Sequence, residues 1–126
     1  MTRRNIASGS TWETRYGYSR AVVDGRHVYV AGTAPIMPED ADPPADAYGQ
    51  AHRCLEIIVK ALQEAGAHPD DVVRTRFFIT DRAYADDVLR AHQEVFAEAR
   101  PANTGVVCDL VDPRWLVEIE VDALIP

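Results

Sequence analysis

Residues 100–123 read RPANTGVVCDLVDPRWLVEIEVDA, and this stretch decides the fold. Two runs typical of β-strands flank a short turn-forming segment with an Asp-Pro pair, which predicts a hairpin or a pair of adjacent strands. The second run alternates strictly, so apolar side chains point one way while Glu118, Glu120 and Asp122 point the other. Three acidic side chains on one strand face require water, cations or a pocket beside them. The function is therefore to be sought first at this strand and at the residues opposite it.

The N-terminal part of the chain predicts an antiparallel hairpin. A β-type run over residues 16–23 is followed by Asp24-Gly25, a strong turn signal, and by a return strand over residues 27–31. Residues 1–14 are polar and irregular, and we expect them to cover the surface or to add a short edge strand. Residues 36–45 form an acidic, proline-rich loop that we expect to hold no regular structure.

The middle of the chain predicts two helices separated by a strand. Apolar residues recur with helical spacing over residues 45–65, a strand pattern covers residues 72–80, and a second helix is expected over residues 83–99. The element order is then β-β-α-β-α-β-β, which indicates an α+β fold with both helices on one face of a mixed sheet. Nothing divides the sequence into repeats, so residues 1–126 are expected to form one domain.

Composition excludes several classes of protein. The net charge of −7 and the single lysine, Lys60, disfavour a nucleic-acid-binding protein, which needs clustered basic residues to neutralise phosphates. The longest uninterrupted apolar stretches are only a few residues, so no membrane span is expected. No apolar run follows the basic residues near the N-terminus, which argues against a secretory signal and favours the cytoplasm.

Cysteines and histidines give no metal-binding pattern. Cys54 and Cys108 lie far apart and are expected to be buried free thiols in a helix and a strand. None of the four histidines has the spacing of a zinc site, so zinc is not expected. His52 and His92 lie at the edges of the helical apolar stripes, and we interpret both as packing or surface residues.

Tyr16, Tyr18 and Arg20 share one face of the predicted first strand by their spacing. Two aromatic rings and a guanidinium on one face could hold a small planar anion by stacking and a two-pronged contact. Alternatively, the tyrosines pack at a subunit seam and Arg20 pairs with an acidic residue across the sheet.

Glu118 and Glu120 are the candidate acid–base residues. A carboxyl group buried beside an apolar wall has a raised pKa and can exchange protons near neutral pH. In the alternative interpretation, which the residues alone favour, the acidic face is solvated or forms ion pairs with Arg74 and Arg76 on the neighbouring strand pattern. No nucleophile triad, glycine-rich phosphate loop or Gly-x-Ser-x-Gly motif is present.

Several short blocks of the sequence form a recognisable set. They are residues 17–22 (GYSRAV), 28–35 (VYVAGTAP), 73–81 (VRTRFFITD), 100–104 (RPANT) and 116–123 (LVEIEVDA). Together they resemble the RidA/YjgF family, once labelled L-PSP endoribonucleases. Each block is degenerate by itself, but the set occurs in the family's order over essentially the whole chain.

The resemblance implies a chorismate-mutase-like α+β fold that assembles as a homotrimer, with the sheets forming a central barrel and a cleft at each subunit interface. It also implies hydrolysis of reactive 2-imino or enamine acids to keto acids and ammonia, without metal or organic cofactor. By the same resemblance, Tyr18 and Ala31 line the cleft, and Glu118 is associated with the attacking water.

The resemblance also exposes two departures. An arginine that grips the substrate carboxylate is replaced by Asn103, and a neighbouring cysteine is replaced by Gly105, which removes a pocket wall. A neutral amide cannot make the charge-assisted, two-pronged contact of a guanidinium. We hypothesise that Arg20 supplies the missing positive charge, and that Asn103 and Thr104 form hydrogen bonds with the ligand.

Three functions remain open at this point. The leading hypothesis is a divergent hydrolase or deaminase acting on a small imine, enamine or keto-acid-like compound. The competing hypothesis is a non-catalytic trimer that binds small molecules or other proteins. A ribonuclease, the older family label, comes third because of the acidic charge.

Overall fold

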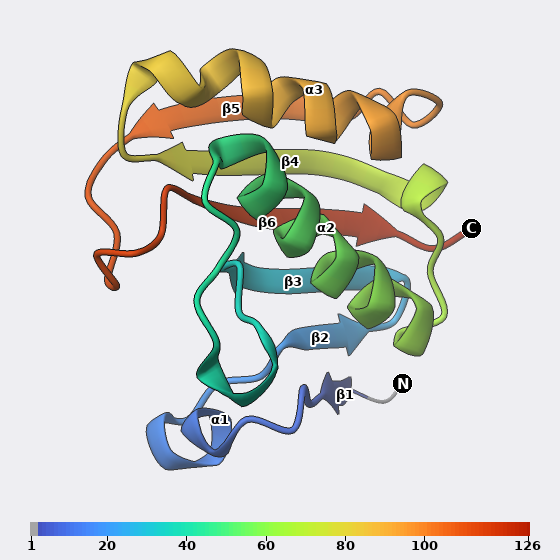
Figure 1. Ribbon diagram of the computed structural model, residues 1–126. Coiled ribbons are helices and arrows are strands. Elements are labelled where there is room, and N and C mark those ends of the chain that lie inside the picture. Colours follow the sequence, from blue (N-terminus) through green and yellow to red (C-terminus); the bar gives the residue numbers. More distant parts are fainter. Residues whose placement is uncertain (1–2) are drawn as a thin grey trace.

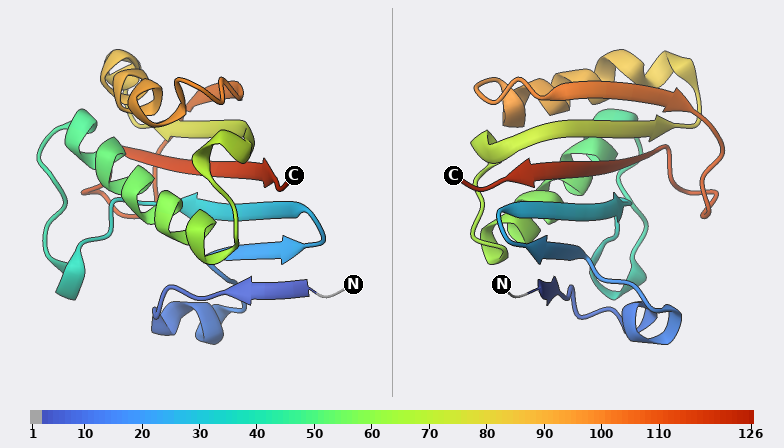
Figure 2. Two further views of the ribbon diagram at one scale, coloured as in Figure 1. Left: turned by 90° about the vertical axis from the view of Figure 1, so that its right-hand side faces the viewer. Right: turned by 180° about the vertical axis from the view of Figure 1, so that it is seen from behind.

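The computed structural model describes residues 3–126 as an α+β fold built on one mixed sheet. Two long helices, α2 (Ala47–Glu64) and α3 (Ala85–Phe96), lie on the same face of the sheet, as the sequence predicts (Figure 1). Seen from behind, the opposite face is bare of these helices (Figure 2). We call the first the helix-covered face and the second the open face.

The sheet has six strands in the order β1-β2-β3-β6-β4-β5. Only β4 and β5 run parallel to each other, and all other neighbouring pairs are antiparallel. The strands are β1 (Arg3–Ile6), β2 (Ala21–Asp24), β3 (His27–Thr33), β4 (Val72–Ile79), β5 (Ala102–Val107) and β6 (Val117–Leu124).

The predicted pairing of the last two strands is wrong. β6 lies between β3 and β4, and β4 separates it from β5. The reason is the helix α3, which carries the chain from the end of β4 back to the start of β5, so β5 must run parallel to β4. Residues 108–116 then lead the chain past β4 to the centre of the sheet.

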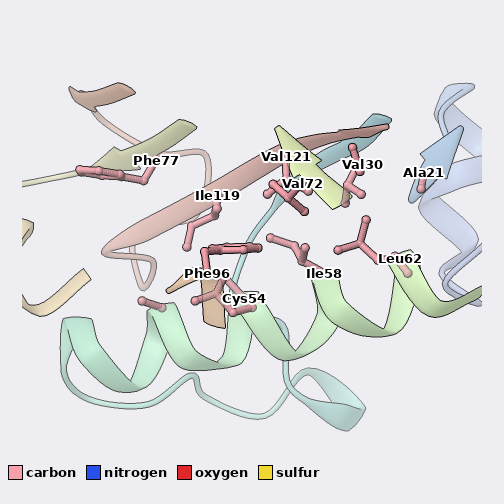
Figure 3. Close-up of a cluster of buried hydrophobic side chains, with 14 of the residues drawn as sticks. Ala21, Val30, Cys54, Ile58, Leu62, Val72, Phe77, Phe96, Ile119 and Val121 are labelled. Carbon is pink, nitrogen blue, oxygen red and sulfur yellow. The ribbon is translucent and has the colours of Figure 1, made fainter. Parts of the chain in front are cut away.

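The core fills the space between the sheet and the two long helices (Figure 3). β6 is buried at every second residue, which confirms the alternation read from the sequence. Cys54 is a buried free thiol on α2, as expected, whereas Cys108 is only partly buried. The fully buried members with the largest side chains include Leu55, Ile58, Leu62, Phe96 and Ile119.

The N-terminal segment differs from the prediction. β1 is the short edge strand that the sequence allowed, but residues 11–16 form a helix, α1 (Thr11–Tyr16), which was not expected. Ser10 caps the backbone N–H of Trp12, and the buried Glu13 carboxylate accepts hydrogen bonds from Ser8. These local contacts stabilise a helix where the sequence predicted irregular chain, and the helix extends to the first residue of the predicted strand. The predicted first strand is therefore shortened, and β2 begins only at Ala21.

Within residues 3–126, three short 3₁₀ turns occur in the connections between the longer elements. One turn, Pro38–Asp40, lies inside the loop for which no regular structure was expected. Another, Arg82–Tyr84, precedes α3, which ends at Phe96 rather than at residue 99. The third, Pro69–Asp71, connects α2 to β4. No helix among residues 3–126 is long and apolar enough to cross a membrane.

Candidate functional site

Glu118 lies on the open face near the middle of the sheet, directly over Gly32 of β3. A Cβ atom added at Gly32 would come within 2.5 Å of Glu118 Oε2, so the absence of a side chain at residue 32 makes room for the carboxylate. No residue in the described range 3–126 donates a hydrogen bond to this half-buried carboxylate. The carboxylate is thus held by packing and remains free to bind a water molecule or a ligand.

Burial is the main influence on the acidity of Glu118. It raises the pKa of the carboxyl group above its usual value, and the nearby Glu120 raises it further, while the Arg20 guanidinium acts in the opposite direction. A raised pKa brings a carboxyl group closer to neutral pH, where it can accept and return a proton.

Arg20 brings a positive charge to the same place. It directly precedes β2, and its Nη2 donates a hydrogen bond of 2.7 Å to the carbonyl oxygen of Gly32. Its Nε is buried and has no hydrogen-bond partner among the described residues. Burial lowers the pKa of Arg20, and the charges of Glu13, Tyr18 and Glu118 oppose that effect. The hypothesis of a positive charge beside Glu118 therefore has a geometric basis.

Tyr18 lies in the connection between α1 and β2 rather than in a strand, so its predicted placement on one strand face with Tyr16 and Arg20 is wrong. Tyr16 ends α1, where the guanidinium of Arg15 lies 5.2 Å from the centre of its ring. Tyr18 lines a shallow hollow of about 590 Å³ on the open face together with Ala31. Further residues around this hollow are Glu13, Tyr29, Glu120 and Asp122.

The two other acidic residues of β6 have a structural partner. Arg76 Nη1 lies 3.6 Å from Glu120 Oε2 and 3.5 Å from Asp122 Oδ2. The ion-pair interpretation of the acidic face is therefore correct for these two residues, with Arg76 as the partner and not Arg74. Glu118 differs from both because no ion pair within the described residues includes it.

Asn103 and Thr104 lie on β5, at the far edge of the sheet and across β4 from Glu118. Asn103 Nδ2 donates to Thr75 Oγ1 at 2.8 Å, and Thr75 Oγ1 lies 2.8 Å from His92 Nε2 on α3. Asn103 thus points to the helix-covered face and Thr104 to the open face. A single chain brings Tyr18, Arg20 and Glu118 together but does not bring Asn103 to them.

His92 is a packing residue, as the sequence predicted, and it also takes part in a hydrogen-bond chain. Its ring packs against Phe96 at 4.8 Å between centres, and its Nε2 is joined through Thr75 to Asn103. Burial lowers the pKa of His92, which favours the neutral ring. A threonine on a strand and a histidine on the following helix are too common for this pairing to be read from the sequence.

Gly105 has a structural role that the sequence did not indicate. A Cβ atom at this position would lie 2.4 Å from Phe77 Cζ, so the buried ring of Phe77 occupies the space of the absent side chain. Whether glycine here also opens a pocket, as the resemblance implies, stays a prediction.

No cluster of three or more His, Cys, Asp or Glu side chains suitable for a metal ion occurs in residues 3–126. The arrangement that remains is the Glu118 carboxylate with a raised pKa and the neighbouring Arg20 guanidinium. Tyr18 lies close to Arg20 and lines the shallow hollow, whereas Glu118 and Arg20 are not among the residues that line it. Such groups can polarise a small molecule and activate water without a metal.

Comparison with known proteins places the chain in a family. A family model described as Endoribonuclease L-PSP matches residues 9–125. The chain belongs to the RidA/YjgF family. An uncharacterized protein of Streptomyces coelicolor is 37% identical to this RidA/YjgF protein, with 95% of this chain and 90% of the relative covered. A RutC family protein of Pyrococcus abyssi is 33% identical over 84% of each chain.

Solved structures agree with the family and the fold. A member of the YjgF/YER057c/UK114 family from Mycobacterium tuberculosis is 39% identical, with a TM-score of 0.89 and coverage of 98% of this chain and 100% of its own. A Rid-family protein of unknown function from Yersinia pestis has 27% identity and a TM-score of 0.87, with coverage of 98% and 100%. The present protein therefore has the RidA/YjgF fold, and family membership supports a small-molecule-binding or deaminase-like role in general.

Proposed function

We propose that this RidA/YjgF protein hydrolyses a small reactive imine or enamine, releasing ammonia and the corresponding carbonyl compound. The observation that carries the proposal is the Glu118 carboxylate, which is half-buried, has a raised pKa and receives no hydrogen bond from residues 3–126. Hydrolysis of an imine needs a group that takes a proton from water and returns one to nitrogen, and Glu118 is suited to that task.

In the proposed reaction, a water molecule held by Glu118 attacks the carbon of the protonated imine. Glu118 accepts a proton from the water as the new C–O bond forms, and a carbinolamine results. Glu118 then gives that proton to nitrogen. As the C–N bond breaks and ammonia leaves, the carboxylate, ionised again, takes the proton of the hydroxyl group, so that the neutral carbonyl compound forms, and it releases this proton to solvent. Arg20 supplies positive charge beside the reacting atoms, and Tyr18 orients the substrate over the hollow.

The proposal includes a homotrimer with its clefts between copies. β5 forms one edge of the sheet, and Tyr18 lies near the other edge, which β1 forms. The β5 edge of one copy therefore meets the Tyr18 side of the next copy when the copies are arranged head to tail. Such an arrangement closes into a ring when the rotation between copies fits. In this proposal the cleft holds Tyr18, Arg20, Ala31 and Glu118, together with Asn103 and Thr104. Sedimentation equilibrium is expected to give three times the chain mass of 14.0 kDa.

Hydrolysis of two preformed imines tests the reaction. 2-Iminopropanoate and 2-iminopropanamide are formed from their carbonyl compounds in concentrated ammonia, diluted into buffer, and followed by stopped-flow absorbance. We expect the protein to accelerate the decay of at least one imine and the Glu118→Gln variant to leave it at the uncatalysed rate. Absence of acceleration for both compounds would favour the alternative, a trimer that binds small molecules without catalysis.

Gly32→Ala is expected to reduce hydrolysis by about ten- to a hundredfold while the protein stays folded. The new Cβ would meet only the flexible end of Glu118, so the carboxylate moves away from its position and the backbone does not need to shift. The measurement combines the imine decay rate with the urea midpoint of unfolding. A variant with full activity would show that the position of the carboxylate over Gly32 is unimportant.

Arg20→Ala is expected to move the acid limb of the pH–rate profile to higher pH. Arg20 lowers the pKa of Glu118, so its removal leaves the burial effect unopposed and the carboxylate loses its basic form at a higher pH. Binding of small keto compounds is expected to weaken in the same variant. Arg82→Ala, at an exposed arginine in the turn before α3, is the control. An unchanged pH profile and equal ligand binding would contradict the role given to Arg20.

A further inference from the structure

The nitrogen end of the Asn103 side-chain amide forms a hydrogen bond within the protein. Its Nδ2 lies 2.8 Å from Thr75 Oγ1 and 3.5 Å from the Thr75 carbonyl oxygen. A carbonyl oxygen accepts hydrogen bonds only, so the amide atom facing it is the nitrogen and not the oxygen. The amide orientation is therefore fixed by Thr75, with its donor groups directed back into the sheet.

The rest of the chain of contacts agrees with this orientation. Because Thr75 Oγ1 accepts from Asn103, its own proton is available to His92 Nε2, which lies 2.8 Å away and can accept it when the ring is neutral. Thr75 is fully buried, and the His92 ring packs against the fully buried Phe96. A buried, satisfied network of this kind holds its members in one arrangement.

The other end of the amide faces outward. Asn103 is exposed, and its Oδ1 has no hydrogen-bond partner among the described residues. The accessible group at residue 103 is thus a hydrogen-bond acceptor with partial negative charge. The sequence led us to expect a hydrogen bond between Asn103 and the ligand, and the structure gives the outward-facing group of the amide as the acceptor.

We infer that Asn103 is a specificity-determining residue that selects a substrate with a hydrogen-bond donor, such as an amide, amine or hydroxyl group, and rejects a carboxylate at that position. The inference rests on the proposed function for the identity of the site. A carboxylate oxygen facing Oδ1 would place two hydrogen-bond acceptors together. In a desolvated site, this contact strongly weakens the binding of the carboxylate compared with that of a ligand that carries a donor. The substrate class is then an uncharged or cationic imine rather than an imino acid bound through its carboxylate at residue 103.

Two stable product analogues test the inference without any need for turnover. 2-Oxopropanamide and 2-oxopropanoate share a carbon skeleton and differ in presenting an amide or a carboxylate. Their dissociation constants are measured by calorimetric or NMR titration of the full chain. We expect the wild-type protein to bind the amide at least about tenfold more tightly than the acid, which corresponds to about 1.4 kcal/mol.

Three variants and one control test whether residue 103 causes the binding preference. Asn103→Arg is expected to reverse the preference, Asn103→Leu to abolish it, and Thr75→Val to weaken it by releasing the amide. Val107→Ala, on the same strand and the same face and also exposed, is the matched control and is expected to leave the preference unchanged. Circular dichroism establishes that each variant is folded.

Wild-type protein that binds the acid at least as tightly as the amide, or that fails to bind the amide, would overturn the inference. So would an unchanged preference in Asn103→Leu. The outcome is separable from that of the proposed function. Loss of imine hydrolysis with the binding preference intact contradicts the deaminase alone, and hydrolysis without any preference contradicts the role of Asn103 alone.

Discussion

Replacing Glu118 with glutamine is expected to lower the rate of imine hydrolysis by at least about a hundredfold, because the amide cannot take a proton from water. The shape of the site is retained, since glutamine has almost the same size and Gly32 leaves the same room for it. Stopped-flow decay of the two imines measures the effect. Glu120→Gln is the matched control, because Glu120 lies on the same strand face but is paired with Arg76.

The same variant is expected to be slightly more stable than the wild type at neutral pH. The folded protein raises the pKa of Glu118, so it binds the proton more strongly than the unfolded chain does. Stability is therefore lost as the pH rises from the unfolded pKa through the folded pKa, and the ionised carboxylate is unfavourable above that window. Glutamine removes this effect. Because Glu118 is half-exposed and screened by solvent, the gain is expected to stay below about 1 kcal/mol in urea unfolding at pH 7.

A Glu118→Gln protein that hydrolyses imines at the wild-type rate would exclude Glu118 as the proton-transfer group. A variant that is inactive and also clearly less stable would instead point to a structural role of the carboxylate. The two measurements together separate catalysis from folding.

Gly105→Cys is expected to lower the free energy of unfolding by about 1–3 kcal/mol. The added side chain would collide with the ring of Phe77, which is buried and cannot swing aside as the end of Glu118 can at Gly32. Urea denaturation measures the loss. The double variant Gly105→Cys/Phe77→Leu is expected to be less destabilised than the sum of the two single variants, because the smaller side chain leaves space.

Additivity of the two single effects would show that Phe77 is not what excludes a side chain at residue 105. Gly32→Ala serves as the control for the general effect of replacing a glycine in a strand, since its added Cβ meets only a flexible carboxylate.

The sequence was sufficient wherever one periodic pattern decided the structure. The helical stripe of α2 and the alternation of β6 were read correctly, because each pattern follows directly from which side faces the core. The placement of β5 was wrong, because strand order depends on the path of α3 and not on any property of residues 102–107. Helix α1 was missed because it is only six residues long and depends on a single serine cap and a buried glutamate, which leave no periodic pattern in the sequence.

The candidate site could be predicted only in part for the same reason. The strand face indicated Glu118 and Glu120 together, and the family resemblance favoured Glu118 of the two. The pairing of Arg76 with the neighbouring acids was among the alternatives considered. Thr75, which lies 28 residues earlier in the chain, determines which end of the Asn103 amide is exposed. The ring of Phe77 determines that residue 105 must be glycine. Such long-range contacts leave no local sequence signal.

The two edges of the sheet differ in a way that bears on solubility. β1 is four residues long and carries two arginines, a composition that discourages other strands from adding to it. β5 has six exposed residues, none charged, and pairs on one side only with β4. A neutral, uncovered edge of this length is a template for uncontrolled strand addition. In the proposed trimer, a neighbouring copy that covered this edge would therefore also protect it against such strand addition.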